Sequence, residues 1–229
     1  MYKDMKTIDI QGTPFSYEEE VLTYENVEAI TLEDCISILQ ITKKLFSEKR
    51  IRFALAFGTL LGAVREKSLI EGDEDVDVFT DDEETLYNNL PFFYENDLRL
   101  IRMVRGKIYS FRSSAGGYID VYILRPLKWY NIWSFYCYRL SNGYMPKKYF
   151  REYEDIVFLG DNYLCPKNPE KLLEFWYGKT WKTPVSGHSF KYEVHTAYYW
   201  HKYYIKTKHA IQKCIGWYKW RHYVKKISE

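Results

Sequence analysis

The sequence predicts an α+β fold in which a mixed central sheet is flanked by helices. Three observations support it: a capped, apolar-periodic helix over residues 31–47, an acidic strand over residues 73–78, and three further strands over residues 98–104, 108–112 and 118–124. Hydrophobic residues make up 46% of the 229-residue chain, which is sufficient for a core. We therefore expect one globular unit of catalytic size.

The remaining elements follow from local signals. Residues 52–57 are typical of a strand, Gly58 and Thr59 of a turn, and residues 60–65 of a short helix whose first amides could receive an anion. A helix is expected over residues 81–89, where acidic residues favour the helix N-terminus. Near the end, residues 155–159 and 162–165 predict a hairpin. Pro169 marks the first turn of a helix that ends at Gly178.

The acidic strand carries an aspartate at every second position. Successive side chains of a strand alternate between faces, so Asp73, Asp75 and Asp77 are expected on one side, opposite Val76 and Val78. Like charges this close repel one another, and a divalent cation resolves the repulsion. The alternative is a solvated acidic turn, which has no need of the alternation.

A further aspartate lies on a later strand. Asp120 stands between Ile119 and Val121, and a lone charge there is costly to bury unless it is paired or bound to metal. If its strand neighbours that of Asp75, it completes a cluster of three carboxylates. The alternatives are an exposed strand aspartate or an ion pair with Arg112.

These motifs resemble a known family. GTLLGAVR, the spaced DEDVD, YIDVY and PKNPEKLLEFWYGKTWKTP are similar to the LicD family of phosphotransferases, relatives of fukutin and fukutin-related protein, with a nucleotidyltransferase fold of the DNA polymerase β type. The resemblance covers residues 53–184. The chain departs from it at Glu66, where the family commonly has His. It also departs before the acid row, where Ile70-Glu71-Gly72-Asp73 replaces Ile-Pro-Trp-Asp.

The resemblance implies transfer of a substituted phosphate, such as phosphocholine, phosphoethanolamine or a polyol phosphate, from a CDP-activated donor to a sugar hydroxyl of a cell-surface polysaccharide or glycoconjugate. Mg²⁺ or Mn²⁺ is the implied cofactor, with Asp75, Asp77 and Asp120 as ligands. Asp73 is expected as an outer ligand or as the base that takes the hydroxyl proton.

Five residues are candidates for binding the donor phosphates. Gly58 lets the backbone approach, Thr59 offers a hydroxyl, and Arg65 can form a bidentate contact. Lys107 and Arg112 are further candidates. The alternatives are a surface ion pair of Arg65 with Glu66 or Glu71, and solvated positions for Lys107 and Arg112.

The chain divides by charge into a catalytic domain over residues 1–190 and a helical, basic, aromatic segment over residues 191–229. That segment holds nine Lys or Arg against two acidic residues, although the whole chain is only +2. It predicts peripheral membrane contact beside a lipid-linked glycan acceptor, or packing on the catalytic domain. Nucleic acid is disfavoured because no known binding module is present.

Scattered cysteines and the polar first residues predict a cytoplasmic protein, either free or at the inner membrane face. Two other functions stay open. One is a glycosyltransferase or nucleotidyltransferase that uses the same aspartates to hold a metal-bound diphosphate. The other is a non-catalytic protein that binds a membrane surface.

Overall fold

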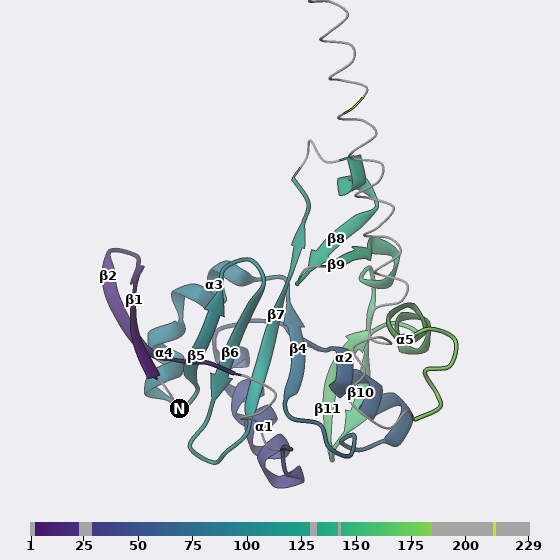
Figure 1. The fold of residues 1–229 in the computed structure, drawn as a ribbon, viewed down its shortest axis with the longest axis horizontal. Coiled ribbons are helices and arrows are strands. Elements are labelled where there is room, and N and C mark those ends of the chain that lie inside the picture. The colour runs from purple at the N-terminus through teal and green to yellow at the C-terminus, as the bar shows by residue number, and fades with distance from the viewer. Residues whose placement is uncertain (1–2, 23–28, 129–131, 142, 185–212, 214–229) are drawn as a thin grey trace, which may run out of the picture.

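A computed structural model describes residues 3–22, 29–128, 132–141, 143–184 and 213 (Figure 1). Its centre is a mixed sheet with the strand order β3-β4-β7-β6-β5. β4 and β7 are parallel, whereas β3–β4, β5–β6 and β6–β7 are antiparallel. The bounds of these strands are Ala54–Leu55 (β3), Val76–Thr80 (β4), Arg99–Val104 (β5), Ile108–Arg112 (β6) and Tyr118–Pro126 (β7).

Helix α1, Leu32–Glu48, begins where the Thr31 side chain accepts the N–H of Asp34. Its buried Phe46 packs on Phe93 at 5.3 Å between ring centroids, and Phe93 packs on Phe111 of β6 at 6.2 Å. Two short helices, α3 (Glu83–Asn88) and α4 (Leu90–Glu95), connect β4 to β5. This face of the sheet therefore carries the main apolar core.

The opposite face carries the polar residues of the sheet and is partly covered by aromatic rings. Phe57 contacts Tyr122 of β7 at 4.9 Å and Trp176 at 4.7 Å between centroids. Phe57 begins α2 (Phe57–Leu61), which continues into a π-helical turn, η1 (Gly62–Glu66), and Trp176 lies in α5 (Pro169–Tyr177). The indole N–H of Trp176 donates to Sδ of Met145 at 3.3 Å.

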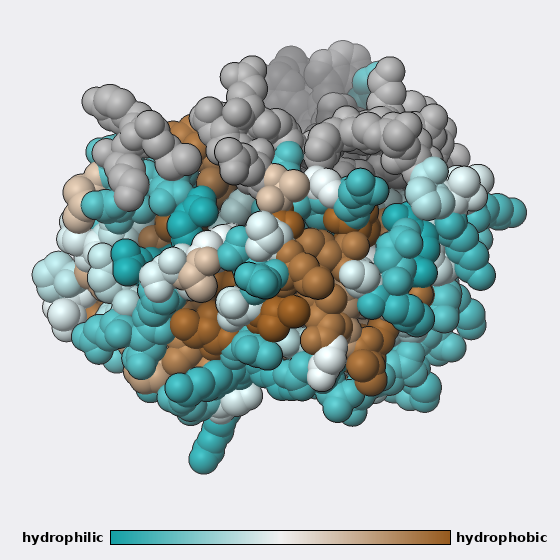
Figure 2. All heavy atoms as spheres, turned by 90° about the horizontal axis from the view of Figure 1, so that it is seen from below, coloured by the Kyte–Doolittle hydropathy of each residue, from teal (hydrophilic) through white to brown (hydrophobic). Residues whose placement is uncertain are grey.

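Hairpins and short strands complete the fold. The first hairpin packs beyond β5, the second beside β3, and β8 and β9 extend the sheet from the end of β7 (Figure 1). From below, apolar side chains gather in the middle of the surface within a hydrophilic border (Figure 2). The bounds are Lys3–Ile10 (β1), Thr13–Glu20 (β2), Ile132–Phe135 (η2), Cys137–Leu140 (β8), Gly143–Pro146 (β9), Lys147–Tyr149 (η3), Tyr153–Phe158 (β10) and Asp161–Pro166 (β11).

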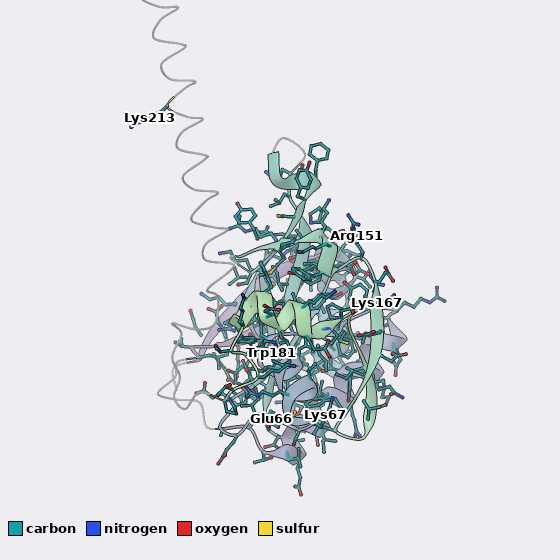
Figure 3. The ribbon with its side chains drawn as sticks, turned by 90° about the vertical axis from the view of Figure 1, so that its right-hand side faces the viewer. Glu66, Lys67, Arg151, Lys167, Trp181 and Lys213 are labelled. Carbon is teal, nitrogen blue, oxygen red and sulfur yellow. The ribbon has the colours of Figure 1, made fainter. Side chains whose placement is uncertain are left out.

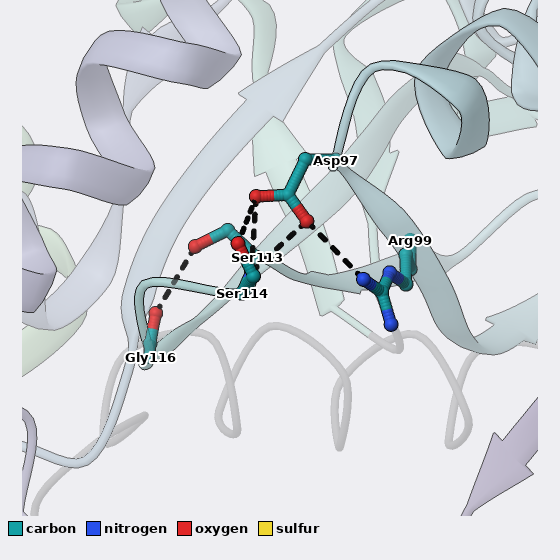
Figure 4. A network of polar contacts seen from close by, with 5 residues as sticks. All are labelled: Asp97, Arg99, Ser113, Ser114 and Gly116. Atoms are coloured by element: carbon teal, nitrogen blue, oxygen red, sulfur yellow. Dashed lines mark hydrogen bonds and ion pairs between the residues drawn. The ribbon is translucent and has the colours of Figure 1, made fainter.

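A polar network fixes the turn that leads into β7 (Figure 4). The carboxylate of Asp97 accepts the N–H and the hydroxyl of Ser114, and it pairs with Arg99 at 3.5 Å. Ser113 Oγ donates to the carbonyl of Gly116 at 3.3 Å. Because the turn is held from both sides, the register between β6 and β7 is defined.

The α+β prediction, with a mixed sheet flanked by helices, is confirmed. The helix over residues 31–47 and the three strands after residue 98 are present within a few residues of their predicted bounds. The hairpin over residues 155–165 and the helix ending at Gly178 are also present. The predicted helix over residues 81–89 is the six-residue helix α3, followed directly by α4.

Three local predictions were wrong. The acidic strand expected over residues 73–78 is β4, Val76–Thr80, so Asp73 and Asp75 lie before the strand rather than on it. The strand expected over residues 52–57 is only Ala54–Leu55, because Phe57 has a φ of 36° that ends the strand. Gly58 and Thr59 accordingly lie in α2 rather than in a turn. The β1–β2 hairpin was not predicted. Residues 191–229, apart from Lys213, lie outside the described part of the chain.

The core makes a stability prediction. Phe46→Ala removes a fully buried ring, so we expect the free energy of unfolding to fall by about 3–5 kcal/mol in urea titration. Phe135→Ala is the matched control because that ring is 76% exposed, and a change below about 0.5 kcal/mol is expected. Equal losses in both variants would contradict this packing.

Candidate active site

Four polar side chains form a row across the sheet. Asp77 of β4 pairs in register with Asp120 of β7, Asp120 with Ser110 of β6, and Ser110 with Arg102 of β5. Residues in register on neighbouring strands face the same side. The row therefore crosses four adjacent strands on the face opposite the main core.

Asp120 is held by two donors from this row. Nη2 of Arg102 donates to Oδ2 of Asp120 at 2.8 Å, and the Ser110 hydroxyl donates to Oδ1 at 2.5 Å. Nε of Arg102 also donates to Oγ of Ser110 at 2.9 Å. The sequence alternative of a pair between Asp120 and Arg112 is thus corrected: the arginine partner is Arg102.

A third carboxylate joins Asp77 and Asp120. Asp75 lies just before β4, and one oxygen from each of the three side chains lies within 4.8 Å of the others. Asp75 is half-buried and hydrogen-bonded to the Tyr118 hydroxyl, whereas Asp77 and Asp120 are only 8% and 4% exposed. The structure thus forms the cluster that the sequence predicted, which we call the carboxylate cluster.

The electrostatics of the cluster are unfavourable without a cation. Burial, then the charges of Asp120 and Asp73, raise the pKa of Asp75 from 3.8 to about 8. Burial, then the charges of Asp75, Asp120 and Asp73, raise the pKa of Asp77 well above its usual value. Burial also raises the pKa of Asp120, although Arg102 and Ser110 oppose that shift.

Helix α2 packs directly on the cluster. The N–H of Gly58 donates to Oδ2 of Asp77 at 3.1 Å, and the N–H of Asp77 donates to Oγ1 of Thr59 at 2.8 Å. A Cβ at Gly58 would meet Oδ2 of Asp73 at 2.9 Å, so a side chain there is excluded unless Asp73 moves. In this structure Gly58 and buried Thr59 hold Asp77 in place.

Asp73 lies beside the cluster rather than within it. Its backbone carbonyl accepts the N–H of Ile30 at 2.8 Å, and its carboxylate is next to Gly58. Its charge contributes to the raised pKa values of Asp75 and Asp77.

The predicted donor-binding cations are dispersed. Arg65 in η1 donates to Oε1 of Glu66 at 2.6 Å and to the carbonyl of Trp181 at 3.1 Å, so it ties the chain after α5 to η1. Figure 3 shows Glu66 and Trp181 on the same side of the molecule. The alternative of an Arg65–Glu66 pair is the arrangement observed.

Arg112 lies on the face of the carboxylate cluster, two residues from Ser110 in β6. It pairs with the buried carboxylate of Glu20 at 3.0 Å, which connects the first hairpin to the sheet. Its guanidinium also lies 5.7 Å from the Tyr118 ring. Lys107, in contrast, lies in the turn between β5 and β6, at the other end of β6 from Arg112. The structure does not bring Lys107 to the carboxylate cluster.

Sequence reasoning missed Arg102, Ser110 and Tyr118. Arg102 gave a usable signal, because it stands between Ile101 and Met103 in an apolar strand, just as Asp120 stands between Ile119 and Val121. A charge in such a strand needs a partner. The register that joins the two strands through Ser110 is not readable from the chain.

The carboxylate cluster could hold a metal ion. Its donors are all carboxylate oxygens, which is the chemistry that hard divalent cations such as Mg²⁺ or Mn²⁺ prefer. Arg102 supplies one positive charge against three aspartates. The donor set therefore fits the metal that the fold implies.

Facing aspartates on parallel strands, a third aspartate two residues upstream and a glycine packed against them define a site of the nucleotidyltransferase type. The family model described as LicD/FKTN/FKRP, nucleotidyltransferase domain, matches residues 50–168, more than half of the chain. The chain belongs to this family. Membership supports an enzyme of phosphotransferase or nucleotidyltransferase type, and the matched residues include the whole carboxylate cluster and Arg102.

Comparison with solved structures found similarity to a lincosamide antibiotic adenylyltransferase, LnuA, in its lincomycin-bound form. The identity is 11%, the TM-score 0.42, and the match covers 71% of this chain and 91% of the other. At that similarity nothing about activity carries over. No curated protein matches the chain.

The raised pKa values predict how stability depends on pH. Folding raises the pKa of Asp75 from 3.8 to about 8, so the folded state binds more protons and loses stability as pH rises between these values. We expect the melting temperature of the metal-free protein to fall relative to that of Asp75→Asn/Asp77→Asn over this range. Mg²⁺ should raise it most near the upper end. A Mg²⁺ shift that is the same at all pH values, or is kept in the double variant, would argue against the cluster as the binding site.

Arg102 predicts a second, separable effect. Arg102→Ala leaves the buried Asp120 without its charged partner, and we expect a loss of about 1–3 kcal/mol in the free energy of unfolding, discounted because Arg102 is partly exposed. Mg²⁺ should recover part of this loss. The control is Arg99→Ala on the same strand, whose exposed pair with Asp97 contributes less than about 1 kcal/mol. Equal losses of unfolding free energy in the two variants would contradict a stabilising role for the contact between Arg102 and Asp120.

Proposed function

We propose that this protein transfers a substituted phosphate from a CDP-activated donor to a sugar hydroxyl of a cell-surface polysaccharide or glycoconjugate. Phosphocholine, phosphoethanolamine and a polyol phosphate are the candidate groups. The observation that carries the proposal is the carboxylate cluster, in which Asp75, Asp77 and Asp120 converge from a parallel strand pair in a LicD-family domain.

In the proposed reaction the acceptor hydroxyl oxygen forms a bond to the phosphorus of the transferred substituted phosphate, and the bond between that phosphorus and the bridging oxygen of the diphosphate breaks. CMP leaves with the electron pair of that bond. A divalent cation bound by the three carboxylates would neutralise the diphosphate charge and lower the pKa of the hydroxyl. The chain contributes by positioning, because phosphoryl transfer needs alignment and charge neutralisation more than covalent catalysis.

Individual residues have defined tasks in this proposal. Asp73 would accept the proton of the hydroxyl, and the position of its carboxylate beside Gly58, next to the cluster, supports this role. Gly58 keeps that space open and orients Asp77 through its N–H. Arg102 holds Asp120 and is 31% exposed, so it is placed to contact a donor phosphate as well.

The other predicted donor contacts have unequal support. Arg112 has the better geometry, because it lies on the active face near Tyr118. Arg65 and Thr59 have structural contacts instead. Arg65 donates to the carbonyl of Trp181, and Thr59 accepts the backbone N–H of Asp77. Lys107 has no geometric support from its turn.

Two other functions are kept as alternatives. A glycosyltransferase or nucleotidyltransferase could use the same carboxylates to hold a metal-bound diphosphate, but the GTLLGAVR motif upstream of the aspartates favours phosphate transfer. A non-catalytic membrane-binding protein is disfavoured, because such a protein has no use for three aspartates whose proximity costs stability.

The acceptor and the location are also proposals. A lipid-linked glycan at the cytoplasmic face of the inner membrane is consistent with residues 191–229, which are rich in basic and aromatic side chains. Within the described residues, no helix has both the length and the apolar character needed to cross a membrane.

The test is isothermal titration with CDP-choline, CDP-ethanolamine, CDP-ribitol, CDP-glycerol and UDP-sugars in the presence of Mg²⁺. We expect one CDP-linked compound to bind only with metal, and Asp75→Asn/Asp77→Asn to weaken that binding at least about a hundredfold because two metal ligands lose their charge. The control, Asp4→Asn/Asp155→Asn, makes the same charge change at exposed positions away from the cluster and should bind normally.

Each outcome decides between the functions. Selective binding of a UDP-sugar would replace the proposal with the glycosyltransferase alternative. No nucleotide binding by a folded protein, checked by its cooperative unfolding, would overturn both.

A further inference from the structure

Residues 125–151 have an unusual charge pattern. The segment contains nine aromatic residues and no Asp or Glu, whereas the chain as a whole is close to neutral. A stretch of this length with charges of one sign calls for an anionic partner. Its six basic residues are Arg125, Lys128, Arg139, Lys147, Lys148 and Arg151.

The described part of this segment forms an arm on the sheet. Its first strand is the end of β7, which pairs with β8 through Leu124–Leu140 and Pro126–Tyr138, and β8 pairs in turn with β9. Figure 1 shows η2, β8 and β9 extending beyond the end of the central sheet, on the side away from the start of β7. We call the described residues of the segment 125–151, which include η2, β8, β9 and η3, the basic arm.

Two consecutive aromatic side chains are exposed on the basic arm. Phe135, at the end of η2, is 76% exposed and the following Tyr136 is 70% exposed. The two other most exposed large apolar residues described, Met5 and Val157, are in separate hairpins. An adjacent Phe-Tyr pair on a projecting element marks a contact surface, because isolated exposed apolar residues are normal but clustered ones are not.

Lysine side chains lie over two other aromatic rings of the basic arm. Nζ of Lys147 lies 5.1 Å from the Tyr138 ring and Nζ of Lys148 lies 4.8 Å from the Tyr149 ring. The backbone N–H of Lys147 donates to the carbonyl of Tyr136, which ties η3 to the exposed pair. Lys148 and Arg151 are exposed, and Figure 3 shows Arg151 on the upper part of the molecule, well above Glu66.

We infer that the basic arm binds the surface of an anionic lipid bilayer. Aromatic rings with neighbouring cations suit the headgroup layer, where rings insert and each basic residue contributes about 1 kcal/mol. A projecting tip suits a flat surface. Single-stranded nucleic acid instead needs a groove that follows its backbone, which two paired strands and a one-turn helix do not form.

The basic arm and the carboxylate cluster are separate along β7. Pro126 lies six residues beyond Asp120, a strand length of roughly 20 Å. Membrane contact through the arm therefore leaves the cluster uncovered. The inference does not depend on the proposed reaction, and it assigns the contact to residues other than 191–229.

The test is sedimentation of the full chain with vesicles of phosphatidylcholine alone or mixed with phosphatidylserine. We expect binding only to the mixed vesicles, with loss at high salt. Phe135→Ser/Tyr136→Ser should weaken it about tenfold or more, and Lys148→Glu/Arg151→Glu should do the same by reversing two charges.

Matched controls change the same residue types elsewhere. Met5→Ser/Val157→Ser removes exposed apolar side chains, and Lys44→Glu/Lys171→Glu reverses two exposed charges outside the arm. Both should bind mixed vesicles as the unchanged chain does. Urea titration confirms that all four variants fold.

Three results would overturn the inference. The first is failure of the unchanged chain to bind mixed vesicles. The second is equal binding by the arm variants, which would assign membrane contact to another part of the chain. The third is preferential binding of a single-stranded oligonucleotide that the arm variants lose, which would assign the arm to nucleic acid.

Discussion

The structure depends on the parallel pairing of β4 with β7, which places Asp77 directly beside Asp120. Two buried carboxylates in register repel each other, and Asp75 adds a third. Four donors surround these carboxylates: Gly58 of α2, Ser110 of β6, Arg102 of β5, and Tyr118 at the start of β7 itself. The hydrogen-bond donors on this face of the sheet are therefore arranged around one concentrated negative charge.

These donors compensate the negative charge of the cluster only in part, and the remaining charge favours binding of a cation. Arg102 and Ser110 neutralise Asp120 in part, but Asp75 and Asp77 keep strongly raised pKa values. A site that is unfavourable by itself gains stability from a bound cation and from what the cation brings. Strain of this kind is expected at a functional site and is offset by the apolar core on the other face of the sheet, around Phe46, Phe93 and Phe111.

The two functional surfaces differ in how they are built. The carboxylate cluster is negatively charged and largely buried, and sheet register fixes the relative positions of Asp77 on β4 and Asp120 on β7. The basic arm is exposed, positively charged and held by short strands that extend β7. The negative cluster therefore lies near the start of β7 and the positive arm at its end. The net charge of +2 does not show this separation of charge.

The sequence by itself determined the local elements and most of the cluster. Alternation identified Asp75 and Asp77 as cluster residues, although β4 begins only at Val76. An isolated acid in an apolar strand identified Asp120, and motif similarity identified the family. Only the tertiary structure decided the partners of these residues, because strand order and register are long-range properties. In the folded structure Asp120 pairs with Arg102 rather than Arg112, and Arg65 donates to the carbonyl of Trp181. Lys107 lies in the turn between β5 and β6. Local patterns fix which face a side chain takes, whereas its neighbour on that face is set by how distant segments pair.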